Sequence, residues 1–238
     1  MLRNKILEFS FKNSCGHIAS ALSMVDYLEV LFFNHIIKRE DIIILGKPFG
    51  SQSYYIIWKE LNWISEIETL SMGVKHDEIP FVYFSEETMG NALGIATGVS
   101  IATNKKIWVN LSDACLQMGN TLEAIQFIGQ HKLSNIFVTI DFNDSQVTGK
   151  ISDILNVNPI IEMFSNYDWK THVVDGHNKD LLIKSFNDVE KEKPNVFMCR
   201  TIKGKGVKSI EGDIKKWHYK KIETLEELQS LVAELQDI

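Results

Sequence analysis

The sequence predicts an α/β fold with a mostly parallel β-sheet covered by helices on both faces. Short, continuous apolar runs recur along the chain, and such runs are typical of strands buried on both faces. Segments with apolar residues at helical spacing separate them, which is the order expected of βαβ units. Ligands bind such sheets at the carboxyl ends of the strands, so polar residues that follow a strand are candidate site residues.

The first expected elements are a helix and a buried strand. Residues 19–35 place apolar side chains at helical spacing, with Asp26 and Glu29 on the other side, which predicts an amphipathic helix. Residues 41–46, DIIILG, form a short apolar run bounded by charge and glycine, which predicts a strand buried on both faces.

A glycine-containing helix and a further alternation of strands and helices follow. Residues 91–102 carry Gly94 and Gly98 four positions apart, which on a helix makes a smooth face for another backbone. The next segments predict, in order, strand, helix, strand, strand, helix and strand, over residues 106–113, 120–133, 135–143, 169–175, 178–192 and 195–202. Residues 220–238 predict a terminal helix with Thr224 and Glu227 as a capping box.

Composition excludes several classes of function. The 238 residues are 45% hydrophobic and 24% charged, which suits one large domain spanning 1–238. A net charge of -6, with Lys and Arg scattered among acids, argues against nucleic-acid binding. Three cysteines without a C-x-x-C pair suggest neither a disulfide framework nor a zinc site, and indicate a reducing cytoplasm. No apolar run approaches the roughly 20 residues needed to span a bilayer, so we expect no membrane association.

An acid and an amide follow two of the expected strands. Asp113 ends one strand and Asn143 follows the next, so in a parallel sheet both can point into one crevice. Mg²⁺ prefers oxygen ligands and usually completes its shell with substrate phosphates. Asp113, Asn143 and the carbonyl of Ser145 could supply such a set, and the helix after Gly119 presents its N-terminus to a diphosphate. On spacing alone, an acid at a strand end is more often a turn or cap residue.

Residues 111–150 resemble the thiamine diphosphate motif of transketolases, which opens with G-D-G, continues with L-x-E-G and ends with D-x-N. Other segments resemble further motifs of that family in the family's order. They are CGHIASALSMVDYLEVLF, MGNALGIATGVSIA, VVDGHNKDLL and KPNVFMCRTIKGKGV followed by WHYK. Several ordered matches along most of the chain are more specific than any one motif.

The resemblance implies a thiamine-diphosphate-binding fold with bound Mg²⁺. The metal ligands it implies are Asp113, Asn143 and the carbonyl of Ser145. It also places the backbone of Ala114 beside the diphosphate. Met89 and Gly90 belong to the segment that corresponds to the loop approaching the cofactor, so the same resemblance implies that they are cofactor-binding residues.

Three histidines match active-site histidines of the family. His17 corresponds to the substrate-side histidine of S-G-H-P, and His218 to the W-H histidine near diphosphate and substrate. His76 corresponds to a third, in a segment shorter than the family's. His177, in D-G-H, is interpreted as shaping the turn before a helix. Viewed alone, each would more often be an ordinary surface or core imidazole.

The chain departs from the family's pattern at the diphosphate. Ser112 and Ala114 replace both glycines of G-D-G, which makes the approach to a diphosphate tighter. Phe49 or a neighbour stands where a diphosphate-binding histidine is expected, so one anion contact is missing. Glu86 and Glu87 would repel an anionic ligand if they faced it.

A further departure concerns coupling between sites. Met118 replaces the glutamate of L-x-E-G, whereas Glu123 matches the second acid of that helix. The family's acids help form a proton-linked network between subunits, and Met carries no proton. The resemblance therefore implies altered coupling between sites.

The resemblance covers only the amino-terminal third of a full transketolase. In the family, the glutamate that activates the cofactor lies on the following domain. This implies a separate C-terminal subunit that carries the pyrimidine-binding domain and that glutamate, in an α2β2 assembly. The leading expectation is transfer of a two-carbon ketol unit from a ketose to an aldehyde or modified sugar acceptor. The alternatives are an α subunit of a 2-oxo acid decarboxylase and a non-catalytic partner subunit.

Overall fold

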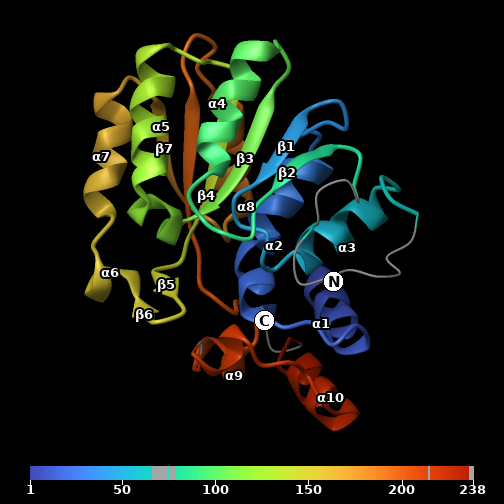
Figure 1. The fold of residues 1–238 in the computed structure, drawn as a ribbon. Coiled ribbons are helices and arrows are strands. Elements are labelled where there is room, and N and C mark those ends of the chain that lie inside the picture. Colours follow the sequence, from blue (N-terminus) through green and yellow to red (C-terminus); the bar gives the residue numbers. More distant parts are fainter. Residues whose placement is uncertain (66–73, 75–78, 214, 236–238) are drawn as a thin grey trace.

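The computed structural model describes residues 1–65, 74, 79–213 and 215–235. Its centre is a six-stranded sheet in the order β2-β1-β3-β4-β8-β7, and every neighbouring pair is parallel (Figure 1). The strands are β1 (Ile42–Leu45), β2 (Val82–Ser85), β3 (Ile107–Ser112), β4 (Ile136–Phe142), β7 (Lys170–Asp175) and β8 (Asn195–Arg200). A short antiparallel pair, β5 (Ser145–Gln146) and β6 (Gly149–Lys150), follows β4. The predicted α/β class with a parallel sheet is confirmed.

Helices cover both faces of the sheet (Figure 1). The α-helices are α1 (Leu2–Lys12), α2 (Ile18–Phe33), α3 (Gln52–Glu60), α4 (Ala92–Ala102), α5 (Gly119–Gln130), α6 (Ile151–Ile154), α7 (Asn158–Asn166), α8 (Lys179–Asn187), α9 (Lys208–Glu211) and α10 (Leu225–Glu234). Alternate strand residues face opposite layers: Ile43 and Leu45 pack with α2, α3 and α8, whereas Ile44 packs with α4, α5 and α7. Two 3₁₀ turns, η1 (Asp113–Gln117) and η2 (Lys216–His218), lie beside the carboxyl edge of the sheet.

The ends of the chain pack together below the sheet. Apolar side chains of α1, α2 and α10 form a third core cluster with Trp217. Thr224 caps α10 by accepting the N–H of Glu227 at 3.1 Å, as predicted. The carboxylate of Glu227 reaches back to the N–H of Glu223 at 3.0 Å and not to that of Thr224. The capping box is therefore present with its return bond shifted by one residue.

One expectation about a helix face was wrong. Asp26 is 4% exposed, so the side of α2 opposite its apolar stripe does not face water there. The space beside Gly94 and Gly98 on α4 is open in the described chain, so the smooth face predicted there is free to accept another backbone. Within the chain a close backbone approach occurs at Gly129, where a Cβ atom would collide with the carbonyl oxygen of Tyr167.

The order of the strands reverses direction between β1 and β3. The chain passes from β1 outward to β2 on one side, then returns to β3 and continues to β4 on the other. The N–H of Gly46, just after β1, donates to Asn110 O on β3 at 2.9 Å, which holds the two strand ends together. Such a switch point opens a crevice at the carboxyl ends of the strands, and ligands of α/β sheets bind there.

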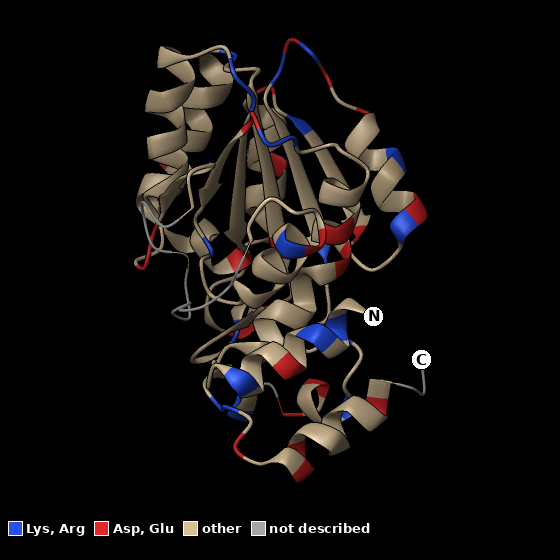
Figure 2. Cartoon of the chain, turned by 90° about the vertical axis from the view of Figure 1, so that its right-hand side faces the viewer, with Lys and Arg blue, Asp and Glu red and all other residues tan. Residues whose placement is uncertain are grey.

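Charged residues are mixed in sign over the surface. Figure 2 shows basic and acidic residues interspersed on the helices and loops of one side. Within the described residues, no helix combines the length and the apolar character needed to cross a bilayer.

Candidate functional site

A cavity of about 510 Å³ lies at the switch point. Residues that follow β1, β3 and β4 line it, together with the start of α2, the loop after β8 and η2. Six of the expected catalytic, cofactor-binding and metal-binding residues line this cavity: His17, Met89, Ala114, Asn143, Ser145 and His218. The structure thus gathers most of the expected site residues in one place. His76 lies outside the described residues.

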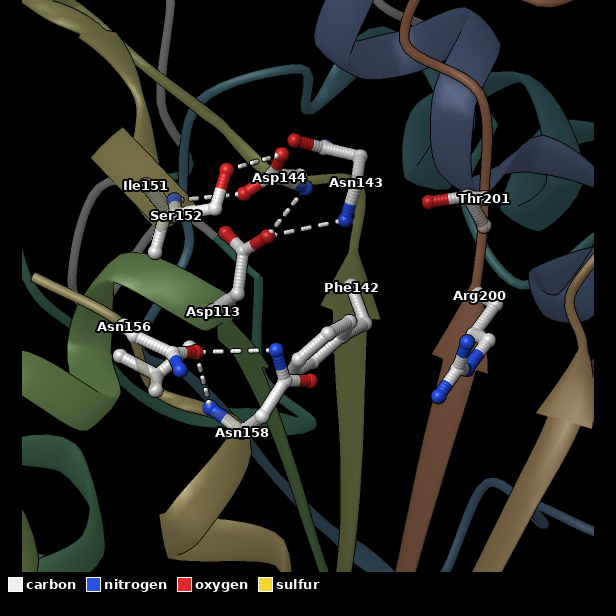
Figure 3. Close-up of a pocket in the computed structure, with 11 residues that line it drawn as sticks. Asp113, Phe142, Asn143, Asp144, Ile151, Ser152, Asn156, Asn158, Arg200 and Thr201 are labelled. Carbon is white, nitrogen blue, oxygen red and sulfur yellow. Dashed lines mark hydrogen bonds between the residues drawn. The ribbon is translucent and has the colours of Figure 1, made fainter. Parts of the chain in front are cut away.

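Asp113 sits behind this cavity with 1% of its surface exposed. One carboxylate oxygen accepts the N–H of Asn143 at 2.9 Å and that of Asp144 at 2.6 Å, and the other accepts the N–H of Ala114 at 3.0 Å. Figure 3 shows the carboxylate pointing toward Asn143 and Asp144 at the edge of a second cavity of about 270 Å³. Asn143 lines both cavities, so Asp113 and Asn143 do meet at one crevice as their strand positions predict.

Two buried carboxylates with opposite pKa shifts lie under the cavity. Burial, and then the nearby charge of Asp141, raises the pKa of Asp113 to about 7. Burial also opposes ionisation of Asp141, but the ammonium of Lys47 and the hydrogen bonds from Lys47, Thr201 and Ser23 lower its pKa below the usual value. Asp141 is therefore ionised near neutral pH, whereas Asp113 titrates close to it.

Asp141 also fixes the orientation of Asn143. The Asn143 amide nitrogen donates to Asp141 Oδ2 at 2.9 Å and to Ser23 Oγ at 3.2 Å. Its Oδ1 accepts the N–H of Ser145 at 3.0 Å. The amide oxygen is thereby held on the side of the loop that follows β4.

The oxygen donors here suit a hard divalent cation. Asp113, Asn143 and Ser145 are joined by direct hydrogen bonds and offer one carboxylate, one amide oxygen and one main-chain carbonyl. In the described part of the chain, no three His, Cys, Asp or Glu side chains gather as a metal-binding cluster, so a cation at this position would rely on amide and main-chain oxygens beside Asp113. The donor set fits Mg²⁺.

Two lysines in the cavity wall were missed as site residues. Lys203 is 5% exposed, and its Nζ lies 3.1 Å from Nδ1 of His218 and 3.2 Å from Oγ of Ser145. Burial, and then the charge of Lys47, lowers the pKa of Lys203 to about 8. Lys203 stands in KPNVFMCRTIKGKGV, a segment that carries the resemblance, and Lys47 lies two residues before Phe49, but only the tertiary fold brings them together.

The two matched histidines lie side by side among aromatic rings. His17 stacks on Phe49 with ring centroids 4.6 Å apart, and lies 5.1 Å from His218 and 5.3 Å from Tyr219. Burial and the neighbouring cationic groups lower the pKa of His17 and of His218 to about 4. Both rings are neutral near pH 7, and His218 presents Nδ1 as an acceptor to the ammonium of Lys203.

The acids of the loop after β2 have different roles. Glu86 is 3% exposed, and its carboxylate accepts the N–H groups of Gly90 and Asn91 at 3.2 and 2.9 Å. Glu87 lines the cavity beside Met89, so the expected repulsion of an anionic ligand applies to Glu87 and not to Glu86. Gly90, with φ +117°, is not among the described residues that line the cavity.

A family model described as "Transketolase, thiamine diphosphate binding domain" matches residues 87–223, more than half of the chain. The chain belongs to the transketolase family. It corresponds to the family's amino-terminal, thiamine-diphosphate-binding section. No support appears for the α subunit of a 2-oxo acid decarboxylase.

Several relatives show how much of a transketolase this family member represents. It is 24% identical over 259 residues to a protein of Phocaeicola vulgatus named as one subunit of apulose-4-phosphate transketolase, covering 99% of this chain and 91% of that protein. It is 28% identical over 261 residues to the protein of the same name from Actinobacillus succinogenes, covering 99% and 94%. With transketolase of Mus musculus it shares 24% identity, covering 92% of this chain and 38% of that protein.

The fold agrees with a solved transketolase. The enzyme from Leishmania mexicana superposes with a TM-score of 0.82 at 16% identity, covering 99% of this chain and 40% of that one. This transketolase-family chain thus covers nearly the whole length of each of these two relatives, the apulose-4-phosphate transketolase subunits of Phocaeicola vulgatus and Actinobacillus succinogenes. It covers less than half the length of the solved enzyme.

Proposed function

We propose that this chain is the amino-terminal subunit of a two-component transketolase that transfers a two-carbon ketol unit from a ketose to an aldehyde or modified sugar acceptor. The observation that carries the proposal is the cavity at the switch point, where His17, His218 and Lys203 meet Asn143 and Ser145. Two relatives of matching length are named as one subunit of a transketolase, which supports a role as one component of two.

The cofactor of this proposal is thiamine diphosphate with Mg²⁺. When bound, thiamine diphosphate supplies the carbanion stabilisation that breaking and forming a carbon–carbon bond requires. Asp113, Asn143 and the carbonyl of Ser145 would hold the metal. The ammonium of Lys203 and a ring N–H of His218 would donate to diphosphate oxygens, with the backbone of Ala114 alongside. Lys203 then supplies positive charge at a site where Phe49 offers none.

The sugar is proposed to contact His17. A neutral imidazole offers one donor and one acceptor, which matches the hydroxyl groups of a ketose. Phe49 and Tyr219 flank the ring and restrict its orientation. The chain's own contribution would be to orient a hydroxyl-rich substrate beside the cofactor.

A separate partner subunit completes the proposed enzyme. It would carry the pyrimidine-binding domain and the activating glutamate, and we propose an α2β2 assembly in which residues 1–238 form one domain. The chain's span of about 40% of a solved transketolase supports this division. We place the enzyme in the cytoplasm, which the buried thiols of Cys115 and Cys199 support.

Native mass spectrometry of the chain purified from its own cells tests the proposal. We expect a complex that contains a second chain, thiamine diphosphate and Mg²⁺, and that moves two-carbon units between ketoses and aldehydes. The variant D113N should lose the cofactor masses because it removes the one carboxylate of the metal set. D153N, an exposed acid on α6, is the matched control and should keep them. A complex with a partner but no cofactor after both ligands are added would make this chain a scaffold and overturn the proposal.

A further inference from the structure

The loop after β8, residues 201–207, carries Lys203 into the cavity and is anchored on both sides of that lysine. On one side, the N–H of Ile202 donates to Nε2 of His177 at 2.7 Å. On the other, the N–H of Gly204 donates at 2.9 Å to a main-chain oxygen of α2. The backbone that presents the ammonium is therefore fixed immediately before and immediately after Lys203.

Arg3, Asp26 and His177 form a network around this loop. Arg3 donates to both carboxylate oxygens of Asp26 at 2.8 and 2.6 Å, and its Nε donates to the main-chain oxygen of Lys205 at 2.8 Å. His177 Nδ1 lies 2.7 Å from Asp26 Oδ2. The three side chains are 15%, 6% and 12% exposed, so water competes little for these bonds. Residues from α1, α2 and the turn after β7 thus converge on one loop.

The hydrogen bonds fix the tautomer of His177. A main-chain N–H can only donate, so Nε2 accepts from Ile202 and the ring proton is on Nδ1, where it donates to Asp26. Burial alone would raise the pKa of Asp26, but the hydrogen bonds from His177 and Arg3 and the charge of Arg3 lower it. A neutral ring therefore bridges an ionised carboxylate and the loop.

Lys203 is suited to receive an anion from this position. It is 5% exposed, and in the described part of the chain it has no carboxylate partner at ion-pair distance. Its Nζ is directed at His218 and Ser145, which line the cavity. An ammonium held in place before binding forms charge-assisted hydrogen bonds without the entropic cost of ordering a lysine side chain.

We propose that Asp26 and His177 are positioning residues for the cofactor's diphosphate, and that they act by holding the loop that presents Lys203. This inference rests on the proposed function, and it assigns a positioning role to Asp26 and His177, which lie outside the cavity. It also explains why the D-G-H turn carries a histidine: the ring spans from Asp26 on α2 to the main chain of Ile202.

The inference is tested with inorganic pyrophosphate and Mg²⁺ titrated calorimetrically into the full chain. Pyrophosphate probes the diphosphate site without a partner subunit. K203M should weaken binding by about 10- to 100-fold because a charge-assisted contact is lost. H177N keeps a donor near the position of Nδ1 but loses the acceptor for Ile202, and should weaken binding by about 3- to 10-fold. H177Q restores an acceptor near the position of Nε2 but not the donor to Asp26, so it should recover part of the affinity that H177N loses.

Two controls separate positioning from general stability. His172, a half-buried imidazole on β7 that stacks on Phe197 at 4.9 Å, lies outside the cavity, so H172N should bind pyrophosphate as the wild type does. In a K203M background, H177N should cause no further loss of affinity for pyrophosphate, because His177 is proposed to affect binding only by positioning the Lys203 ammonium. Hydrogen exchange at Ile202 and Gly204 should accelerate in H177N and remain slow in H177Q.

The outcomes distinguish this inference from the proposed function. A wild-type chain that binds no pyrophosphate would count against the cofactor site, and the positioning role would fall with it. Normal wild-type binding with an undiminished effect of H177N in the K203M background would overturn the positioning role alone. The same follows if H177N loosens the loop in hydrogen exchange yet binds pyrophosphate as tightly as the wild type.

Discussion

Lys47 Nζ donates to the carboxylate of Asp141, and this ion pair is buried under the cavity at the end of β4. The Asp141 side chain has no exposed surface, and that of Lys47 is 9% exposed. The hydroxyl of Ser23 and the amide of Asn143 also donate to this carboxylate, at 2.7 and 2.9 Å. The pair thus joins the ends of β1 and β4 and orients a proposed metal ligand.

Removal of the Lys47 ammonium should destabilise the fold strongly. K47M leaves the Asp141 charge buried without its cation, which we expect to cost about 3–5 kcal/mol of unfolding free energy, measured by urea denaturation. K5M breaks the exposed Lys5–Glu60 pair, where the atoms lie 2.7 Å apart, and should cost less than about 1 kcal/mol. Equal losses in the two variants would contradict a structural role for the buried pair.

Replacement by Gln should change different properties at the adjacent acids Glu86 and Glu87: stability at Glu86 and ligand affinity at Glu87. E86Q replaces one of two acceptors with a donor that faces an N–H group, and should lower the unfolding free energy by about 1–3 kcal/mol. E87Q removes a negative charge from the cavity wall, so it should tighten pyrophosphate binding by about 2- to 5-fold and leave stability nearly unchanged. Calorimetric titration and thermal denaturation of both variants measure these effects, and a destabilised E87Q with unchanged affinity would refute the assignment.

Stability should depend on the titration of His17 between pH 6.5 and 4. Its pKa is about 4 in the folded chain and near 6.5 in the unfolded chain, so only the unfolded state gains a proton in this window. The contribution is fully present above pH 6.5 and decreases as the pH falls toward 4, by as much as about 3 kcal/mol.

H17N is the matched variant because Asn tolerates the positive φ of 56° at this position and does not titrate. Unfolding free energies of wild type and variant, measured at several pH values, should change relative to each other as the pH drops, with the wild type losing more. Parallel pH profiles would show that His17 titrates normally in the folded chain.

Two helical glycines should tolerate alanine very differently. G129A places a methyl group against the carbonyl oxygen of Tyr167, and we expect a loss of about 1–3 kcal/mol. G94A meets open space on α4 and should gain about 0.5–1 kcal/mol through helix propensity. Thermal denaturation of the two variants measures both changes, and a neutral G129A would mean that α7 can shift away from α5.

The strand ends were predictable because the relevant signals are local. The apolar runs before Asp113 and Asn143 predict parallel buried strands, and geometry then brings their ends to one edge, as found. Helix α3 was not predicted because its residues from Gln52 to Trp58 are all buried, so no polar stripe marks a helical period.

Partnerships between distant residues were beyond the reach of sequence patterns. Asp26 looked like a solvent-facing acid because it lies opposite the apolar side of α2, and nothing local indicates that Arg3 covers it. No sequence pattern marks Lys47 or Lys203 as a site residue, and only the fold places both in the wall of the cavity at the switch point. The resemblance identified the segments, whereas the network of side chains required the structure.

The contact between Arg3 and the carbonyl of Lys205 joins positions 202 residues apart in the sequence. Closing so long a loop is entropically costly, so we expect this contact to form after the sheet has brought the intervening elements together. On this view the central strands assemble before the rim of the cavity is complete. A nascent chain still lacking its final residues would already have a sheet but not yet a finished site.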